Sequence, residues 1–83
     1  MHIRIRYFAS LREIVGQSEE QLTLPVQATI SDARAQLLTR YPGLQPILDR
    51  CLCAVNRGYA NAETVLHDGD ELVFIPPMGG GIY

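Results

Sequence analysis

A single long amphipathic stretch, residues 30–41, restricts this 83-residue chain to a small mixed fold. Five apolar residues recur at helical spacing along one stripe: Ile30, Ala33, Leu37, Leu38 and Tyr41. Thr29, followed three residues later by Asp32, predicts a capping box at the start of this helix, and Pro42-Gly43 predicts its end. A helix with one apolar face needs a partner layer, which the remaining segments must supply.

The rest of the chain alternates between short strand patterns and turns. Period-two alternation and short apolar runs predict strands at residues 2–8, 20–24, 51–55 and 71–75, with a weak edge strand within 59–66. Residues 9–15 predict a short helix that Gly16 ends in a left-handed conformation, and residues 44–50 predict a loop or short turn.

This order of elements predicts an α+β fold with a mixed sheet of four to five strands and one main helix packed on one face. It is the layout of the ubiquitin-like β-grasp fold. We expect one domain over residues 1–76 and a flexible tail over residues 77–83.

Composition excludes several classes of function. With 47% hydrophobic and 19% charged residues the chain can form a folded core, and a net charge of -2 offers no basic excess for nucleic acid or an anionic membrane. No stretch is long and apolar enough to span a bilayer, and residues 1–6 alternate charge with hydrophobe where a signal peptide would be apolar. We therefore expect a cytoplasmic protein with neither nucleic acid nor membrane as partner.

The body of the chain shows no catalytic or metal-binding constellation. Cys51 and Cys53 are the only cysteines, and without nearby histidines they cannot complete a zinc or iron–sulfur site. We expect a buried, reduced pair of thiols and no metal.

The predicted sheet has one face that no second helix covers. Five apolar residues fall on it: Phe8, Leu52, Ala54, Val73 and Ile75. An exposed apolar patch usually marks a partner surface, so we predict partner binding by Phe8, Leu52, Val73 and Ile75, with Met78 beyond the last strand. The alternative is that loops cover this face or that its residues are individually exposed.

The C-terminus is the unusual part of the sequence. The closing strand runs into Pro76-Pro77 and then into Gly79, Gly80 and Gly81. Prolines favour an extended backbone, and glycines have no side chains to obstruct a narrow channel. Glycines near a terminus can also be no more than a frayed end.

An ordered set of short motifs resembles the small, sulfur-carrying subunit of molybdopterin synthase over nearly the whole chain. The motifs are Phe8-Ala9, Leu11-Arg12-Glu13, Ala54-Val55-Asn56, Leu66, Asp68-Gly69-Asp70-Glu71, Phe74-Ile75-Pro76-Pro77 and Gly80-Gly81. The thiazole-synthesis sulfur carrier is similar in its last strand and diglycine, but the double proline favours the molybdopterin family.

The resemblance implies a carrier that is not an enzyme on its own and binds no cofactor. A ubiquitin-activating-type adenylyltransferase would use ATP to adenylate Gly81, which would become a thiocarboxylate and donate sulfur to a pterin precursor in the large subunit. Two small and two large subunits would form a heterotetramer.

The chain departs from this family in one respect, because Ile82 and Tyr83 follow Gly81. We expect a peptidase to cleave between Gly81 and Ile82. The alternatives are a homologue that carries no sulfur and an artificial extension of the chain. For the function itself, the alternatives are a carrier for thiazole or cysteine synthesis and a ubiquitin-like modifier or binding module.

Overall fold

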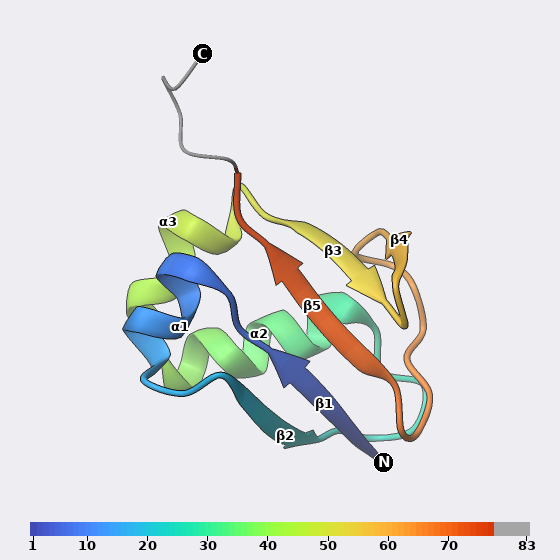
Figure 1. Ribbon diagram of the computed structural model, residues 1–83. Coiled ribbons are helices and arrows are strands. Elements are labelled where there is room, and N and C mark those ends of the chain that lie inside the picture. Colours follow the sequence, from blue (N-terminus) through green and yellow to red (C-terminus); the bar gives the residue numbers. More distant parts are fainter. Residues whose placement is uncertain (78–83) are drawn as a thin grey trace.

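The structure is a computed structural model that describes residues 1–77. It forms a sheet with helices on one side (Figure 1). The elements in chain order are β1 (His2–Arg6), α1 (Ala9–Val15), β2 (Glu19–Thr23), α2 (Ile30–Arg40), the 3-10 turn η1 (Pro42–Leu44), α3 (Gln45–Leu48), β3 (Leu52–Val55), β4 (Gly58–Ala60) and β5 (Glu71–Ile75).

The five strands lie in the order β2-β1-β5-β3-β4. β1 and β5 pair in parallel at the centre, and the other neighbouring pairs are antiparallel. The predicted α+β class, mixed sheet and main helix are therefore confirmed. The predicted boundary between a domain of residues 1–76 and a tail of residues 77–83 stays a prediction, because residues 78–83 lie outside the described part.

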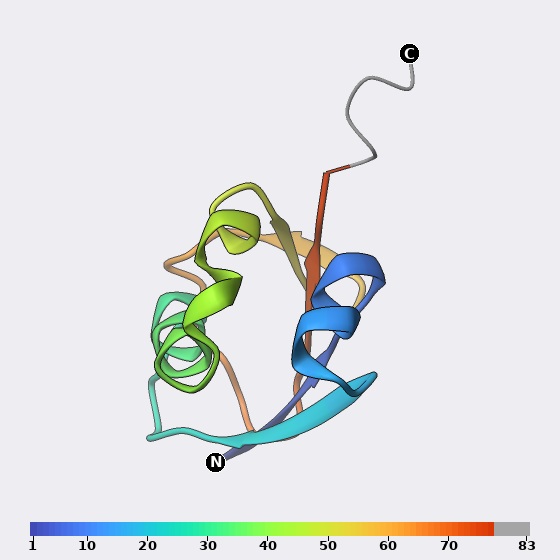
Figure 2. The same ribbon diagram turned by 90° about the vertical axis from the view of Figure 1, so that its left-hand side faces the viewer.

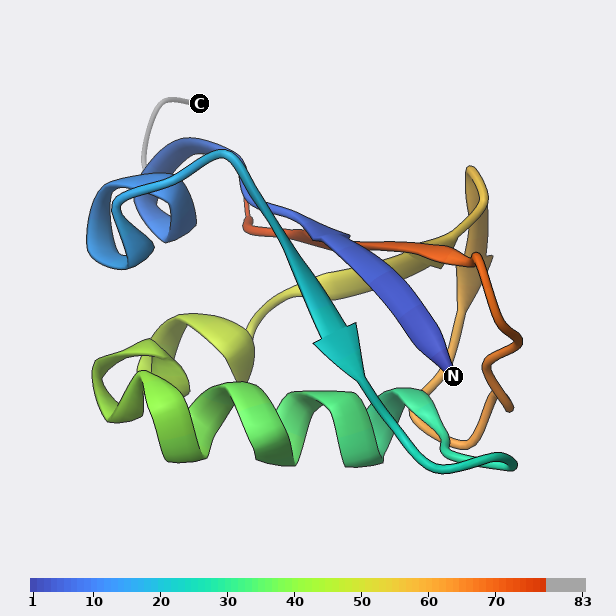
Figure 3. The same cartoon turned by 90° about the horizontal axis from the view of Figure 1, so that it is seen from below.

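The core lies between the sheet and α2, which crosses beneath the strands in Figure 3. The inward residues of the strands are fully buried, as the alternation predicts: Ile3, Ile5, Leu22, Leu72 and Phe74. Ile30, Ala33 and Leu37 of α2 are buried against them, whereas Leu38 and Tyr41 are half-buried at the edge of the stripe. Burial of these apolar side chains is the main favourable contribution to folding.

The start of α2 has the predicted capping box. The Thr29 hydroxyl accepts a hydrogen bond from the Asp32 amide at 3.3 Å, and the Thr29 amide donates to the Asp32 carboxylate at 2.9 Å. The amides of Ile30 and Ser31 donate to carbonyl groups of the loop before β5, so the first turn of the helix is also held by tertiary contacts.

Two segments differ from the sequence-based expectation. Residues 44–50 are not a simple loop, because Pro46 lies in the first turn of the short helix α3, where proline is tolerated, and both Leu44 and Leu48 are buried. The predicted edge strand within 59–66 is shortened to β4, because a turn at residues 61–64 interrupts it. The Asn61 side chain accepts from the Glu63 amide at 3.1 Å, which favours this turn over continued pairing.

The capping box provides a test of the fold. We expect Thr29→Ala to lower the free energy of unfolding by about 1 kcal/mol, because it leaves a first-turn amide without its side-chain acceptor. Urea denaturation measures this. Thr39→Ala is the control, since the Thr39 hydroxyl donates a hydrogen bond to the Ala35 carbonyl within the same helix, and the loss of this bond should change stability by less than about 0.5 kcal/mol. Equal effects of the two substitutions would show that the cap is unimportant.

Candidate functional site

The last strand, β5, leads the chain out of the centre of the sheet. β5 pairs with β1 as far as Val73 and with β3 as far as Ile75, so it is held on both sides almost to its end. Pro76 is half-buried and Pro77 is exposed, and neither has an amide hydrogen to continue the ladder. The chain leaves the sheet at the end that lies opposite the N-terminus (Figure 1).

A groove lies at the point where the chain leaves the sheet. In Figure 2 the end of β5 rises between α1 and α3. The groove residues come from these helices, from the segment after α3 and from the chain following β5: Ser10, Pro46, Ile47, Arg50, Pro76 and Pro77. We call it the tail-root groove. Arg50 contributes the one charged side chain among them.

The outer face of the sheet carries the apolar residues that the alternation predicts. Leu52 is 59% exposed and is paired with Ile75, and Phe8, which lies two residues beyond β1 and directly before α1, is 45% exposed. Val73 and Ile75 are half-buried on the neighbouring strand β5. The structure therefore brings these four predicted residues to the same end of the sheet as the tail-root groove, whereas the predicted residue Met78 lies outside the described residues.

The expectation that Ala54 is exposed on this face is wrong. Its side chain is only 7% exposed, because its partners across the sheet are the larger residues Tyr59 and Val73. Tyr59 itself is 78% exposed and shares a hollow on the outer face with Val73 and Ile75. Its place beside Ala54 is set by the pairing of β3 with β4, which the sequence pattern did not reveal.

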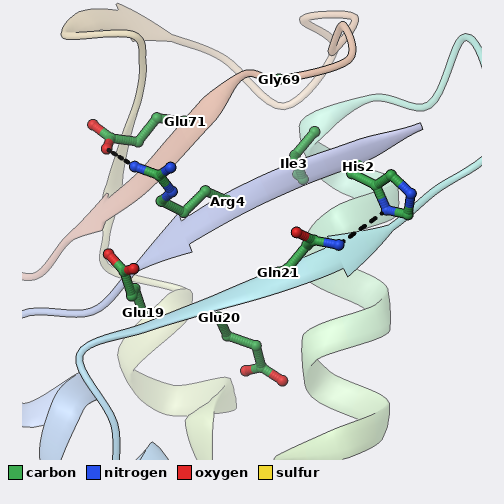
Figure 4. Close-up of a pocket in the computed structure, with 8 residues that line it drawn as sticks. All are labelled: His2, Ile3, Arg4, Glu19, Glu20, Gln21, Gly69 and Glu71. Atoms are coloured by element: carbon green, nitrogen blue, oxygen red, sulfur yellow. Dashed lines mark hydrogen bonds and ion pairs between the residues drawn. The ribbon is translucent and has the colours of Figure 1, made fainter.

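The other half of the outer face is polar. Figure 4 shows a hollow over β1 and β2 where Arg4 lies 3.8 Å from Glu71 and the Gln21 amide lies 3.2 Å from the His2 ring. Arg6 also lies 3.7 Å from Glu71. Such exposed ion pairs contribute little to stability. This hollow is at the start of β5, away from the tail-root groove.

A half-buried carboxylate on the inner side of β2 was missed by the sequence analysis. Glu20 accepts hydrogen bonds from the hydroxyl groups of Tyr7 at 2.8 Å and Tyr41 at 3.1 Å, and it forms an ion pair with Arg40. The sequence does contain a signal for this position: Glu20 lies two residues before Leu22 and four before Leu24, so it shares the inward face of the strand with these buried residues.

The contacts of Glu20 stabilise the fold by linking separate elements of the structure. Burial, together with the hydrogen bond to Glu20, raises the pKa of the Tyr7 hydroxyl far above its usual range, so this group stays protonated. The cluster fixes the end of β1 to β2 and α2. With Tyr7 held inward, the next residue along the chain, Phe8, lies on the exposed side.

The two cysteines are free thiols, and both are half-buried rather than fully buried. They line one crevice at the edge of the core with Arg34. The Cys51 thiol donates to the Ile47 carbonyl at 3.2 Å, and burial raises its pKa to about 11. Within residues 1–77, no three side chains of the metal-binding types come together.

The predicted tail sites cannot be placed. Gly79, Gly80, Gly81 and Ile82 lie outside the described residues, and Pro76 and Pro77 are the tail residues whose positions are given. Within residues 1–77, none of the helices has the length and apolar character that crossing a membrane requires.

The fold and its open face define a ubiquitin-like β-grasp protein. SAMP1 from Haloferax volcanii has the same fold, with a TM-score of 0.87 and 26% identity over 98% of this chain and 100% of that chain. A chain in the complex of subunits 1 and 2 of molybdopterin-converting factor from Helicobacter pylori gives a TM-score of 0.71 and 27% identity, covering 98% of this chain and 100% of that chain.

Sequence comparison narrows this class. The sequence profile of the ThiS family matches residues 5–81. The molybdopterin synthase sulfur carrier subunit of Chlamydomonas reinhardtii is 36% identical over 83 residues, covering 98% of this chain and 100% of that protein. The chain therefore belongs to the ThiS family.

The raised pKa of Cys51 predicts slow alkylation. A thiol with a pKa of about 11, instead of 9.0, has about a hundredfold less thiolate at pH 8, and the thiolate is the reactive form. In the single-thiol variant Cys53→Ser, we expect iodoacetamide to modify Cys51 slowly at pH 8 and faster as the pH approaches 11. The same variant unfolded in urea is the control. Equal rates for folded and unfolded chains at pH 8 would contradict the assignment.

Proposed function

We propose that this chain is the sulfur carrier subunit of a molybdopterin synthase. The observation that carries the proposal is the end-to-end similarity to a molybdopterin synthase sulfur carrier subunit, combined with a family match that runs through β5 and ends at Gly81. The structure supports it with a central strand, β5, that ends in Pro76 and Pro77, and with an apolar patch beside that end.

The proposed chemistry takes place at the carboxylate of Gly81. A terminal carboxylate with a pKa of roughly 3.5 is ionised in the cell and is a poor electrophile. Its oxygen attacks the α-phosphorus of ATP in an adenylyltransferase of the ubiquitin-activating type, and pyrophosphate leaves. Hydrosulfide, or a donor equivalent to it, then attacks the acyl carbon and displaces AMP. The product is a thiocarboxylate, which donates its sulfur to a pterin precursor.

In this reaction the folded body positions the tail and does no catalysis. The four residues that follow Pro77, residues 78–81, span at most about 14 Å when extended, enough to enter a pocket on a partner. Pro76 and Pro77 favour an extended start, and Gly79 and Gly80 provide a slender neck. The chain binds no cofactor of its own, and ATP belongs to the activating partner.

The proposed partner surface is the apolar part of the outer face, formed by Phe8, Leu52, Val73 and Ile75. We propose that the large subunit covers it while taking the tail, in a heterotetramer of two small and two large subunits. The Helicobacter pylori structure, a complex of subunits 1 and 2 of molybdopterin-converting factor, supports this pairing by analogy. We assign the reaction to the cytoplasm, where ATP is available and thiols stay reduced.

Gly81 needs a free carboxylate before it can react, but further residues follow it in the sequence. Ile82 and Tyr83 lie beyond the family match. We propose that a peptidase cleaves after Gly81.

Intact-mass measurement tests the carrier chemistry. We expect the 1–81 chain, incubated with ATP, an adenylyltransferase of this class and sulfide, to exchange one oxygen for sulfur. The full-length chain and the 1–81 chain carrying Gly81→Val should stay unchanged, because the first lacks a free Gly81 carboxylate and the second has a side chain in the narrow channel. Sulfur on the full-length chain would refute the processing step. An unmodified 1–81 chain would refute the carrier role.

A second candidate function is protein modification. It is favoured by the high TM-score of 0.84 to the small archaeal modifier protein 1 of Haloferax volcanii, at 26% identity over 93% of this chain and 98% of that chain. A modifier would form an amide bond between Gly81 and a lysine of another protein. Recovery of such conjugates, with no transfer of sulfur to a pterin, would favour it.

The proposed docking face is tested by Leu52→Glu. We expect the affinity of the 1–81 chain for the cognate large subunit to fall about tenfold or more, because a charge is buried in an apolar contact. Val26→Glu is the matched control: Val26 is 77% exposed, and it lies in the loop after β2, away from the tail. Isothermal titration calorimetry gives both affinities. If the two substitutions have the same effect, the outer face is not the docking surface.

A further inference from the structure

We propose that the tail-root groove is a second contact site for the partner that receives the tail, and that Arg50 binds a carboxylate on an acidic segment of that partner. The proposal rests on the proposed function, because it assumes a partner that accepts the tail. It concerns a surface distinct from the apolar part of the outer face.

The groove has one charge and an apolar lining. Pro46 and Pro77 are exposed, and Ile47 and Pro76 are half-buried. The hydroxyl of Ser10 on α1 adds a neutral polar group. Among the lining residues that the structure describes, Arg50 therefore presents a positive charge without an acidic neighbour, beside apolar surface. This fits a segment that combines an aliphatic side chain with a carboxylate.

Arg50 differs from most arginines of this chain. Four of the seven arginines lie within 4.0 Å of a carboxylate: Arg4, Arg6, Arg34 and Arg40. For Arg50, no carboxylate of residues 1–77 lies within that distance. Its neighbour along the chain, Asp49, is engaged by Arg34 of α2 and is not available to it. Among the described residues that line it, the groove thus has no acidic group to neutralise Arg50.

Arg50 lies beside the start of the segment that the partner takes, so it would lie close to the partner. Pro76 and Pro77 form part of the groove wall, and they begin the segment that the partner must take. A protein that accepts the chain from Pro77 to Gly81 has the mouth of its channel directly over this groove. The Arg50 guanidinium then faces the rim of that channel, whatever the contacts made further along the tail.

The expected contact is a charge-assisted hydrogen bond at the edge of an interface. A guanidinium can donate two parallel N–H bonds to one carboxylate, and this geometry fixes orientation as well as adding affinity. Partial exclusion of water by the surrounding prolines strengthens the interaction relative to a fully exposed pair. The contact would set the angle at which the tail enters the channel.

Binding measurements with matched variants test the proposal. In the 1–81 chain, Arg50→Gln removes one positive charge while retaining a polar side chain, and Ala35→Glu adds one negative charge on the exposed side of α2. Both change the net charge by the same amount. We expect Arg50→Gln to weaken binding to the cognate large subunit about tenfold and to reduce the salt dependence of the affinity. The affinity of the Arg50→Lys variant should lie between those of the Arg50→Gln variant and the unchanged chain, and the Ala35→Glu variant should bind as tightly as the unchanged chain.

Each other outcome has a distinct meaning. If the unchanged 1–81 chain binds and Arg50→Gln binds equally well, the inference is wrong and the proposed function stands. If Ala35→Glu weakens binding as much as Arg50→Gln, the effect is one of net charge and the site is refuted. Stronger binding by Arg50→Gln would mean that Arg50 holds the chain's own terminal carboxylate, which also overturns the proposal. Failure of the unchanged chain to bind would remove the proposed function and the inference together.

Discussion

The parallel pairing of β1 with β5 is the contact on which the rest of the structure depends. It joins the first and last strands of the described chain at the centre of the sheet, with Arg4 opposite Glu71 and Arg6 opposite Val73. Parallel neighbours cannot be joined by a tight turn, so the intervening residues form the helices and the outer strands on either side. The strand that leads to the tail is therefore also a central strand of the sheet.

Much of the fold could be predicted because its signals are local. The capping residues Thr29 and Asp32 and the left-handed Gly16 set helix ends through contacts within a few residues, and the structure confirms both. The short helix α3 and the truncated strand β4 could not be predicted in the same way. Their formation depends on burial of Leu44 and Leu48 and on a side-chain turn at Asn61, which compete with weak local preferences.

In the candidate site, too, the residues placed by local sequence could be predicted, and those placed by tertiary contacts could not. Strand phase alone places Phe8, Leu52, Val73 and Ile75 on the outer face, since alternate residues share a face. Ala54 was misassigned because its burial depends on which strand lies beside it, and pairing partners are not local information. Arg50 could not be predicted as part of the site, because a single arginine after a turn belongs to no sequence motif or periodic pattern. Its significance comes from the packing of α1 and α3 against the end of β5.

The direction of β5 also has a mechanical consequence. Its hydrogen bonds to β1 and β3 run across the strand, whereas a pull on the tail acts along it. Such a force loads both ladders in shear, so that many bonds must fail together rather than one after another from the end. The sheet therefore resists a pull along β5 more strongly than a force that peels the strand away sideways.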